Sequence, residues 1–148
     1  MAVPTWKRKL SNTEYLFQTY NFCIRLNEIM ANKPRKYKTN NIDRILNTAF
    51  DALKHCQTAN SIFFQQNSSE QDYFTRRKFL QTARGEIQNV ATISYIFIET
   101  VRRHDSESGE KLYKQEMEIG DYCENINRLI EGVIKSDTEI YKKYIKTR

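Results

Sequence analysis

Apolar residues recur every three or four positions along four stretches of the chain, and two-residue alternation is nearly absent. This spacing places apolar side chains on one face of an α-helix, so the pattern predicts four amphipathic helices. The expected inward-facing positions are Leu16, Tyr20, Cys23 and Met30 with Phe17 and Ile24 alongside; Ile42, Ile45, Leu46, Ala49, Leu53, Cys56, Ala59 or Asn60, and Phe63; Tyr73, Leu80, Ala83, Ile87, Val90, Ser94, Phe97 and Val101; and Leu112, Ile119, Cys123, Ile126, Ile130 and Val133.

Capping and helix-breaking residues mark the boundaries of these helices. The run from Ser11 to Glu14 is a capping box that starts the first helix, and Pro34 ends it because the residue before a proline disfavours helical geometry. Asn40 or Asn41 is expected to cap the second helix, and the run from Ser68 to Gln71 to start the third. Residues 137–148 either continue the fourth helix or form a short extra turn.

Short connections favour antiparallel neighbours, so the sequence predicts an all-α fold, an up-down-up-down antiparallel four-helix bundle with a basic N-terminal arm. With 148 residues, four glycines and two prolines, one helical domain is expected. We expect residues 1–10 to form the arm, residues 11–135 the bundle and residues 136–148 a C-terminal helical extension.

Composition narrows the class of protein. No run of about 18 apolar residues occurs, so no membrane span is expected, and the first residues lack the apolar stretch of a secretory signal. Cys23, Cys56 and Cys123 are isolated and fall on apolar faces, as small buried residues do in a reducing compartment. A cytoplasmic protein is therefore expected.

The positive charge of the chain is concentrated near its start. The net charge is +6; residues 1–38 carry eight cations and two anions, whereas residues 39–148 carry sixteen of each. Such asymmetry favours an anionic partner, most often nucleic acid, although an ordinary solvated surface is the alternative reading.

The candidate nucleic-acid-binding residues fall into three clusters that are expected at the two ends of the bundle. Tyr37 or Trp6 would stack on an exposed base; alternatively, Trp6 anchors the arm on the bundle or on a protein partner. The candidates are Lys7, Arg8 and Lys9; Lys33, Arg35, Lys36, Tyr37 and Lys38; and Arg76, Arg77, Lys78 and Arg84.

Catalytic and metal-binding patterns are not apparent. His55 and Cys56 are adjacent, so on a helix their side chains diverge by about 100° and do not share a proton or a metal readily. The chain contains no Glu-x-x-His pair, HExxH or phosphate-binding glycine loop. We therefore expect a protein that is not an enzyme and uses no metal or cofactor.

Three helical glycines indicate close helix contacts. Glycine within a helix costs up to about 1 kcal/mol relative to alanine, so Gly85, Gly120 and Gly132 are expected where another helix approaches. That helix is either internal or part of a second copy of the chain.

Several segments resemble a family of small bacterial and phage four-helix proteins. They are N-K-P-R-K-Y-K-T-N at 32–40, followed by I-D-R-I-L-N-T-A-F-D-A-L-K-H-C at 42–56, R-R-K-F-L-Q-T-A-R-G-E-I at 76–87, and I-G-D-Y-C-E-N-I-N-R-L-I-E-G-V-I at 119–134. The family includes the accessory variability determinant (Avd) of diversity-generating retroelements and the proteins encoded in intervening sequences of ribosomal RNA genes. The likeness spans roughly residues 11–135.

This resemblance implies a homopentameric, non-catalytic protein that binds RNA or DNA through a basic surface. It also implies association with a reverse transcriptase during mutagenic copying of a template RNA. The ribosomal branch of the family implies instead a helical protein-interaction scaffold without a direct nucleic-acid role. The N-terminal arm and the tail beyond Ser136 depart from the shorter members of the family.

Overall fold

A computed structural model describes residues 13–105 and 109–147, and within these ranges all regular structure is helical. The long helices are α2 (Glu14–Ala31), α3 (Asp43–Ser61), α4 (Glu70–His104) and α5 (Gly109–Ile140). A 3-10 turn at Arg35–Tyr37 and a π turn at Lys38–Ile42 connect α2 to α3, and a second π turn at Tyr141–Ile145 extends α5. No described helix has an apolar stretch long enough to cross a bilayer.

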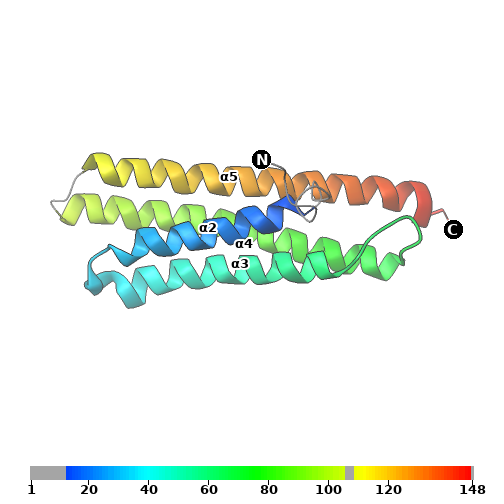
Figure 1. The fold of residues 1–148 in the computed structure, drawn as a ribbon, viewed down its shortest axis with the longest axis horizontal. Coiled ribbons are helices and arrows are strands. Elements are labelled where there is room, and N and C mark those ends of the chain that lie inside the picture. The colour runs from blue at the N-terminus through cyan, green and yellow to red at the C-terminus, as the bar shows by residue number, and fades with distance from the viewer. Residues whose placement is uncertain (1–12, 106–108, 148) are drawn as a thin grey trace, which may run out of the picture.

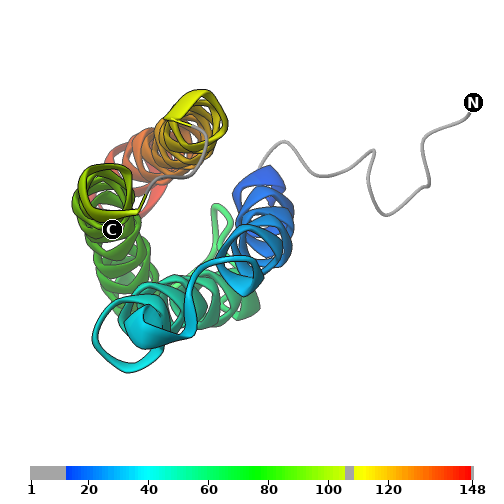
Figure 2. The same cartoon turned by 90° about the vertical axis from the view of Figure 1, so that its left-hand side faces the viewer.

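The four long helices lie side by side along a common direction (Figure 1). Viewed from one end, they follow one another around a common core (Figure 2). Helix α2 also contacts α5, where the Phe22 and Tyr122 rings stack with centroids 5.3 Å apart. Each helix therefore buries its apolar face against two neighbours.

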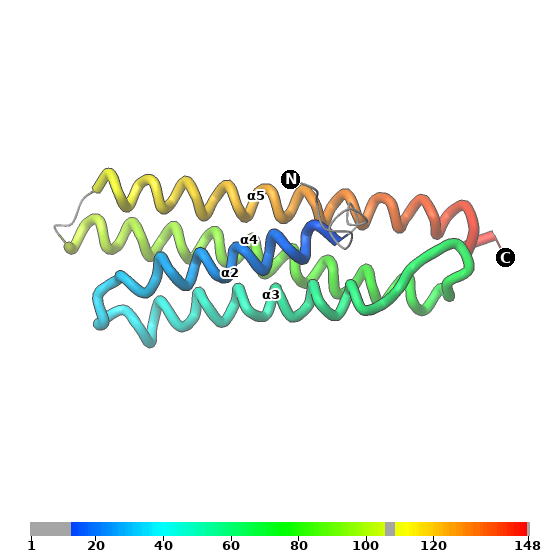
Figure 3. Tube along the Cα trace, viewed as in Figure 1, coloured from blue at the N-terminus to red at the C-terminus, as the bar shows by residue number. Residues whose placement is uncertain are grey.

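The helices differ in length, which gives the two ends of the bundle different structures. At about 1.5 Å per residue, the 35 residues of α4 span about 50 Å, whereas the 18 residues of α2 span about 27 Å. The tube drawing shows α2 alongside only part of α4 and α5, and the connection between α3 and α4 running beyond the end of α3 (Figure 3). We call the end with the α2–α3 connection the proximal end and the opposite one the distal end.

The predicted buried faces are confirmed for α4 and α5. All of the positions expected inside on these helices are buried, together with Ile98 on α4. The three cysteines are also buried and unpaired, as expected, and burial raises the pKa of Cys56 to about 12. Helix α5 passes residue 136 without a break, and Ile145 in its π turn is buried.

The predicted face of α2 is confirmed at Cys23 and Met30, which are buried, and wrong at the other positions. Tyr20 and Ile24 are exposed and Leu16 and Phe17 are only partly buried, whereas a stripe through Tyr15, Phe22, Leu26 and Ile29 forms the core. The reason is the close contact with α3. Small side chains face each other there, with Thr19 Oγ1 3.8 Å from Cys56 Sγ and the Cys23 thiol donating to the Ala49 carbonyl oxygen at 3.5 Å.

The face of α3 is confirmed except at its edges. Leu46, Leu53 and Asn60 are partly buried, Ala52 lies in the core, and Phe63 is 74% exposed because the helix ends at Ser61.

Two of the predicted caps are also wrong. Ser69, not Ser68, caps α4 by accepting a hydrogen bond from the Asp72 amide at 3.0 Å. Helix α3 has no side-chain cap, because the preceding π turn already places Ile42 in helical geometry and supplies its backbone bonds. Helix α2 follows Thr13, and Ser11 lies outside the described residues.

A buried ion pair lies at the distal end of the core. Arg76 of α4 and Asp137 of α5 are each 7% exposed; Arg76 Nε donates to Asp137 Oδ2 at 2.6 Å, and Nη1 donates to the Ile62 carbonyl oxygen at 3.0 Å. Arg76 thus joins α4, α5 and the connection after α3. This contact corrects the expectation that Arg76 faces a nucleic acid.

We expect Asp137→Ala to lower the free energy of unfolding by about 3–5 kcal/mol, because the guanidinium of Arg76 would stay buried without its counter-ion. Urea denaturation followed by circular dichroism measures the change. The double variant Arg76→Met, Asp137→Leu is expected to lose much less, since no isolated charge remains. An equal loss in both variants would contradict this account.

Candidate nucleic-acid interface

The connection between α2 and α3 is compact. Pro34, with φ −56° and ψ 139°, turns the chain out of α2, and the 3-10 and π turns follow at once. The basic residues between Lys33 and Lys38 therefore lie on a short folded segment attached to two helices.

Tyr37 and Lys36 attach this segment to the end of α4. The Tyr37 hydroxyl donates to Asp105 Oδ2 at 2.6 Å, and Lys36 Nζ donates to Oδ1 at 3.1 Å. The hydrogen bond from Tyr37 lowers the pKa of Asp105, and the bond from Lys36 adds to the effect. The same contacts raise the pKa values of Tyr37 and Lys36. We call this group the Asp105 anchor.

The Tyr37 ring is a packing group. It meets the Phe97 ring edge to face, with centroids 5.2 Å apart, and is partly buried against the core. This position differs from the expected one, in which the ring is open to a nucleic-acid base. The ring fixes the connection on α4.

Three of the predicted cations line one pocket between the end of α2 and the start of α3, which we call the loop pocket. Lys33, Arg35 and Lys38 contribute the positive charge, Asp43 is the one acid, and Met30, Ile42 and Leu46 supply apolar surface. Asn27 and Ala31 complete the lining. Within residues 13–105 and 109–147, Arg35 and Lys38 make no salt bridge and are exposed.

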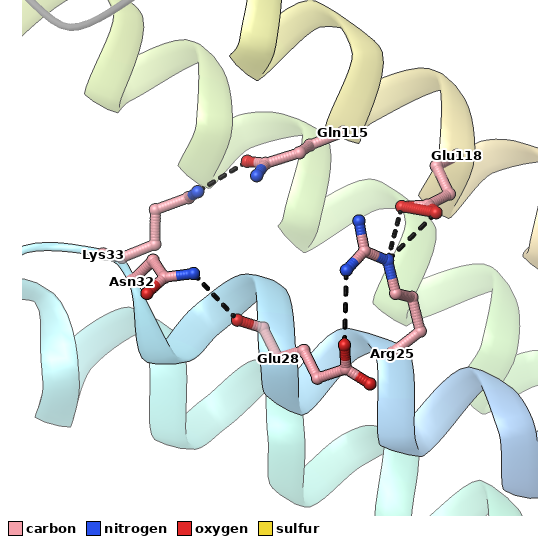
Figure 4. Close-up of polar contacts among 6 residues, drawn as sticks. All are labelled: Arg25, Glu28, Asn32, Lys33, Gln115 and Glu118. Carbon is pink, nitrogen blue, oxygen red and sulfur yellow. Dashed lines mark hydrogen bonds and ion pairs between the residues drawn. The ribbon is translucent and has the colours of Figure 1, made fainter.

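Lys33 is held by an uncharged partner. Its Nζ donates to Gln115 Oε1 of α5 at 2.5 Å (Figure 4). Arg25, about two turns earlier, pairs with carboxylates: its Nε lies 2.9 Å from Glu118 Oε2 and its Nη1 3.5 Å from Glu28 Oε2. Arg25 and Lys36 are therefore neutralised by carboxylates, whereas Arg35 and Lys38 make no salt bridge within the described residues.

The end of α4 lies beside this site. The contact of Lys36 with Asp105 establishes the proximity. Arg103 is exposed there, whereas Arg102 pairs with Glu99 at 3.1 Å. Arg103 thus adds positive charge near the proximal end.

The predicted cations of α4 do not form a single site. Arg77 donates to the Tyr73 hydroxyl at 2.7 Å, and with Lys78 it lines a shallow pocket beside Phe74. Arg84 pairs with Glu131 of α5 at 2.6 Å. Lys7, Arg8, Lys9 and Trp6 lie outside the described residues.

His55, which is next to Cys56 in the sequence, pairs with a carboxylate of another helix. His55 Nδ1 lies 2.6 Å from Glu86 Oε1, and the ring stacks on Phe79. The histidine therefore bridges α3 and α4 through these two residues and not through Cys56. No group of three or more His, Cys, Asp or Glu side chains capable of holding a metal occurs in the described part of the chain.

Two functional contributions escaped the sequence reasoning. Asp105 was not singled out, although an acid directly after Arg-Arg-His at a predicted helix end is an available partner for the basic connection. Nothing in the sequence marks Gln115 as a binding partner. It is one polar residue within the apolar spacing of α5, and such residues occur on many helices for other reasons. Only the alignment of α5 against α2 reveals its contact with Lys33.

Comparisons with protein-family models, with curated proteins and with solved structures found no match for this chain.

We expect Asp105→Asn to loosen residues 33–41 while leaving the four helices intact, because the carboxylate accepts both bonds of the anchor. Hydrogen–deuterium exchange measures this as faster exchange of the amides between Lys33 and Asn41.

Acidification is expected to have the same effect. The pKa of Asp105 is lowered below its ordinary value of 3.8, so the anchor is complete above that value and is lost as the pH falls through the lowered pKa.

The control for Asp105→Asn is Glu110→Gln, which removes a carboxylate from an exposed pair with Lys114. Unchanged exchange in Asp105→Asn would show that Tyr37 packing alone holds the segment.

Proposed function

We propose that this protein is a non-enzymatic accessory protein that binds nucleic acid through the loop pocket. The observation that carries the proposal is the gathering of Lys33, Arg35 and Lys38 in one pocket with a single acid, Asp43. A guanidinium and two ammonium groups suit phosphate oxygens, since arginine bonds two of them at once and lysines act as point charges.

The wider role rests on the sequence resemblance. By that likeness, the protein associates with a reverse transcriptase of a diversity-generating retroelement and with its template RNA, and it supports mutagenic synthesis of complementary DNA. The up-down-up-down order of the helices and assembly as a homopentamer belong to the same proposal. The loop pocket supports it by supplying positive charge at one end of a stiff bundle.

An open groove between α4 and α5 supports self-association. Added Cβ atoms at Gly85, Gly120 and Gly132 would meet nothing within 4 Å, so no helix of the described residues approaches these glycines closely. For Gly85 and Gly120, which line the groove, we propose contact with a second copy of the chain. Gly85 and Gly120 line the groove together with Ala91 and Cys123.

Next to the groove, Ser94 is 1% exposed, and its Oγ has no hydrogen-bond partner among the described residues. Buried hydroxyls are usually satisfied, and a donor or acceptor from another chain would satisfy this one. The same groove also suits the alternative function, a protein-interaction scaffold without a nucleic-acid role.

We expect Arg35→Ala, Lys38→Ala to weaken RNA and DNA binding across sequences and to reduce the slope of log affinity against log salt by about 1.5, because two phosphate contacts are removed. Fluorescence anisotropy of labelled oligonucleotides at several salt concentrations measures both quantities. Helicity should be unchanged, since both side chains are exposed.

The matched control is Arg25→Ala, Lys54→Ala, which removes one neutralised cation and one exposed cation of α3. Equal weakening in the control would attribute binding to overall charge. Binding by the wild-type protein that does not change with salt would contradict the nucleic-acid proposal, and intact self-association in that case would favour the scaffold.

We expect Gly120→Gln to reduce self-association without unfolding the protomer. Glutamine is the better helix former by up to about 1 kcal/mol and has room in the isolated chain, but its side chain would fill the groove. Sedimentation velocity measures the assembly state. Gly132→Gln is the control, because Gly132 does not line the groove. The same assembly in both variants would exclude this groove as the contact.

A further inference from the structure

A second surface, at the distal end, combines stacked aromatic rings with exposed cations. The rings of Tyr73 on α4 and Tyr141 after α5 stack with centroids 4.2 Å apart and planes within 4°. Phe74 packs against both, with centroids 5.1 Å from Tyr73 and 5.6 Å from Tyr141. We call these three residues the distal aromatic cluster.

Hydrogen bonds hold the two tyrosines of the cluster, whereas Phe74 is half exposed. Tyr73 is 2% exposed, and its hydroxyl contacts Thr138 at 3.1 Å and accepts from Arg77. The Tyr141 hydroxyl donates to Glu70 at 2.9 Å. Phe74 is 50% exposed although it contacts both tyrosines, so one part of its ring is supported by protein while the rest faces solvent.

Cations lie beside this exposed ring and next to Tyr141 in the chain. Arg77 and Lys78 line the shallow pocket that also includes Phe74, Gln81 and Thr82. Lys142 and Lys143 directly follow Tyr141 and are exposed. Of the nearby acids, Glu70 accepts the bond from Tyr141, and Asp137 is buried with Arg76. The four cations Arg77, Lys78, Lys142 and Lys143 outnumber the three acids near the cluster in the chain that are not buried, which are Glu70, Asp72 and Glu139.

We propose that the distal aromatic cluster binds single-stranded nucleic acid, with a base stacked on Phe74 and the adjoining phosphates on Lys78, Lys142 and Lys143. The inference rests on the proposed function and adds to it a second contact surface and a preference for unpaired strands. The exposed phenyl ring offers a face or an edge to any base, and the lysines follow the backbone.

A preference for single strands follows from the geometry of the ligand. In a duplex the base faces are covered by their neighbours, so a surface aromatic ring meets them only at an end. Unpaired nucleotides expose these faces and stack on aromatic side chains. Phosphate contacts alone would bind both forms, so the contribution of Phe74 distinguishes this surface from the loop pocket.

The distal aromatic cluster and the loop pocket lie far apart along α4. Tyr37 bonds Asp105 at the C-terminal end of α4, while Phe74 lies in the first turns of the same helix. About 30 residues of helix separate them, or about 45 Å along the axis. A single strand long enough to reach both surfaces would bind more tightly than a short one, whereas a short strand would use either surface alone.

The test compares Phe74→Ala, Phe74→Tyr and wild-type protein for binding to a 5′-labelled 12-nucleotide oligo(U) and to a 12-base-pair RNA duplex. We expect Phe74→Ala to weaken oligo(U) binding about tenfold with little effect on the duplex, and Phe74→Tyr to retain it, because a phenol stacks as a phenyl ring does. Phe50→Ala, another half-exposed phenylalanine on α3, is the matched control and should bind as wild type.

Lys142→Gln, Lys143→Gln should weaken both ligands and reduce the salt dependence, and Lys54→Gln should not. An equal effect of Phe74→Ala on both ligands, or no effect on oligo(U), would overturn the inference while leaving the proposed function in place. Failure of wild-type protein to bind either ligand would instead overturn the proposed function. Circular dichroism of each variant checks the fold, and Phe74→Tyr keeps the test decisive if Phe74→Ala unfolds.

Discussion

The bonds from Tyr37 and Lys36 to the carboxylate of Asp105 determine what the proximal end of this protein can do. A basic segment of six residues would ordinarily spread in water, since its charges repel one another. Here one carboxylate accepts two hydrogen bonds, and the Tyr37 ring packs on Phe97, so the segment is held on the end of α4. Lys33, Arg35 and Lys38 then line the pocket between α2 and α3.

The charge excess of the chain is thus used in two ways. Arg25 and Lys36 contact carboxylates from other elements and help to assemble the bundle, whereas Arg35 and Lys38 stay exposed. A count of charges along the sequence does not separate these roles. The same division appears on α4, where Arg76 is a buried structural group and Lys78, two residues on, lies at the surface. Adjacent helical positions point in different directions, so neighbouring cations acquire different roles.

The sequence was sufficient for the helices and for the buried faces of α3, α4 and α5, apart from the edges of α3. On α4 and α5 the apolar spacing has one consistent solution over more than 30 residues, so the face was predictable. On α2 two apolar stripes compete, and the choice depends on the small side chains Thr19 and Cys23 meeting α3, which is a property of the packed pair. The sequence likewise does not decide between Ser68 and Ser69 as the cap of α4, because either hydroxyl is a suitable acceptor. The π turn before α3 has no distinct sequence pattern of its own.

The candidate site was predictable in composition but not in arrangement. Lys33, Arg35 and Lys38 were expected together, and they line one pocket; Tyr37 was expected at the surface, but its contacts with Asp105 and Phe97 place it in the framework. Those contacts join residues 68 and 60 positions apart, beyond the reach of spacing arguments.

The most direct test of the central claim is a nuclear magnetic resonance titration of the full chain with a short oligonucleotide, following the Nε–H signal of Arg35 and the amides of residues 33–43. The account predicts shifts concentrated in these signals at low salt and their loss as salt is raised. Binding that leaves them unmoved would show that the gathered cations of the α2–α3 connection are not where this protein meets nucleic acid.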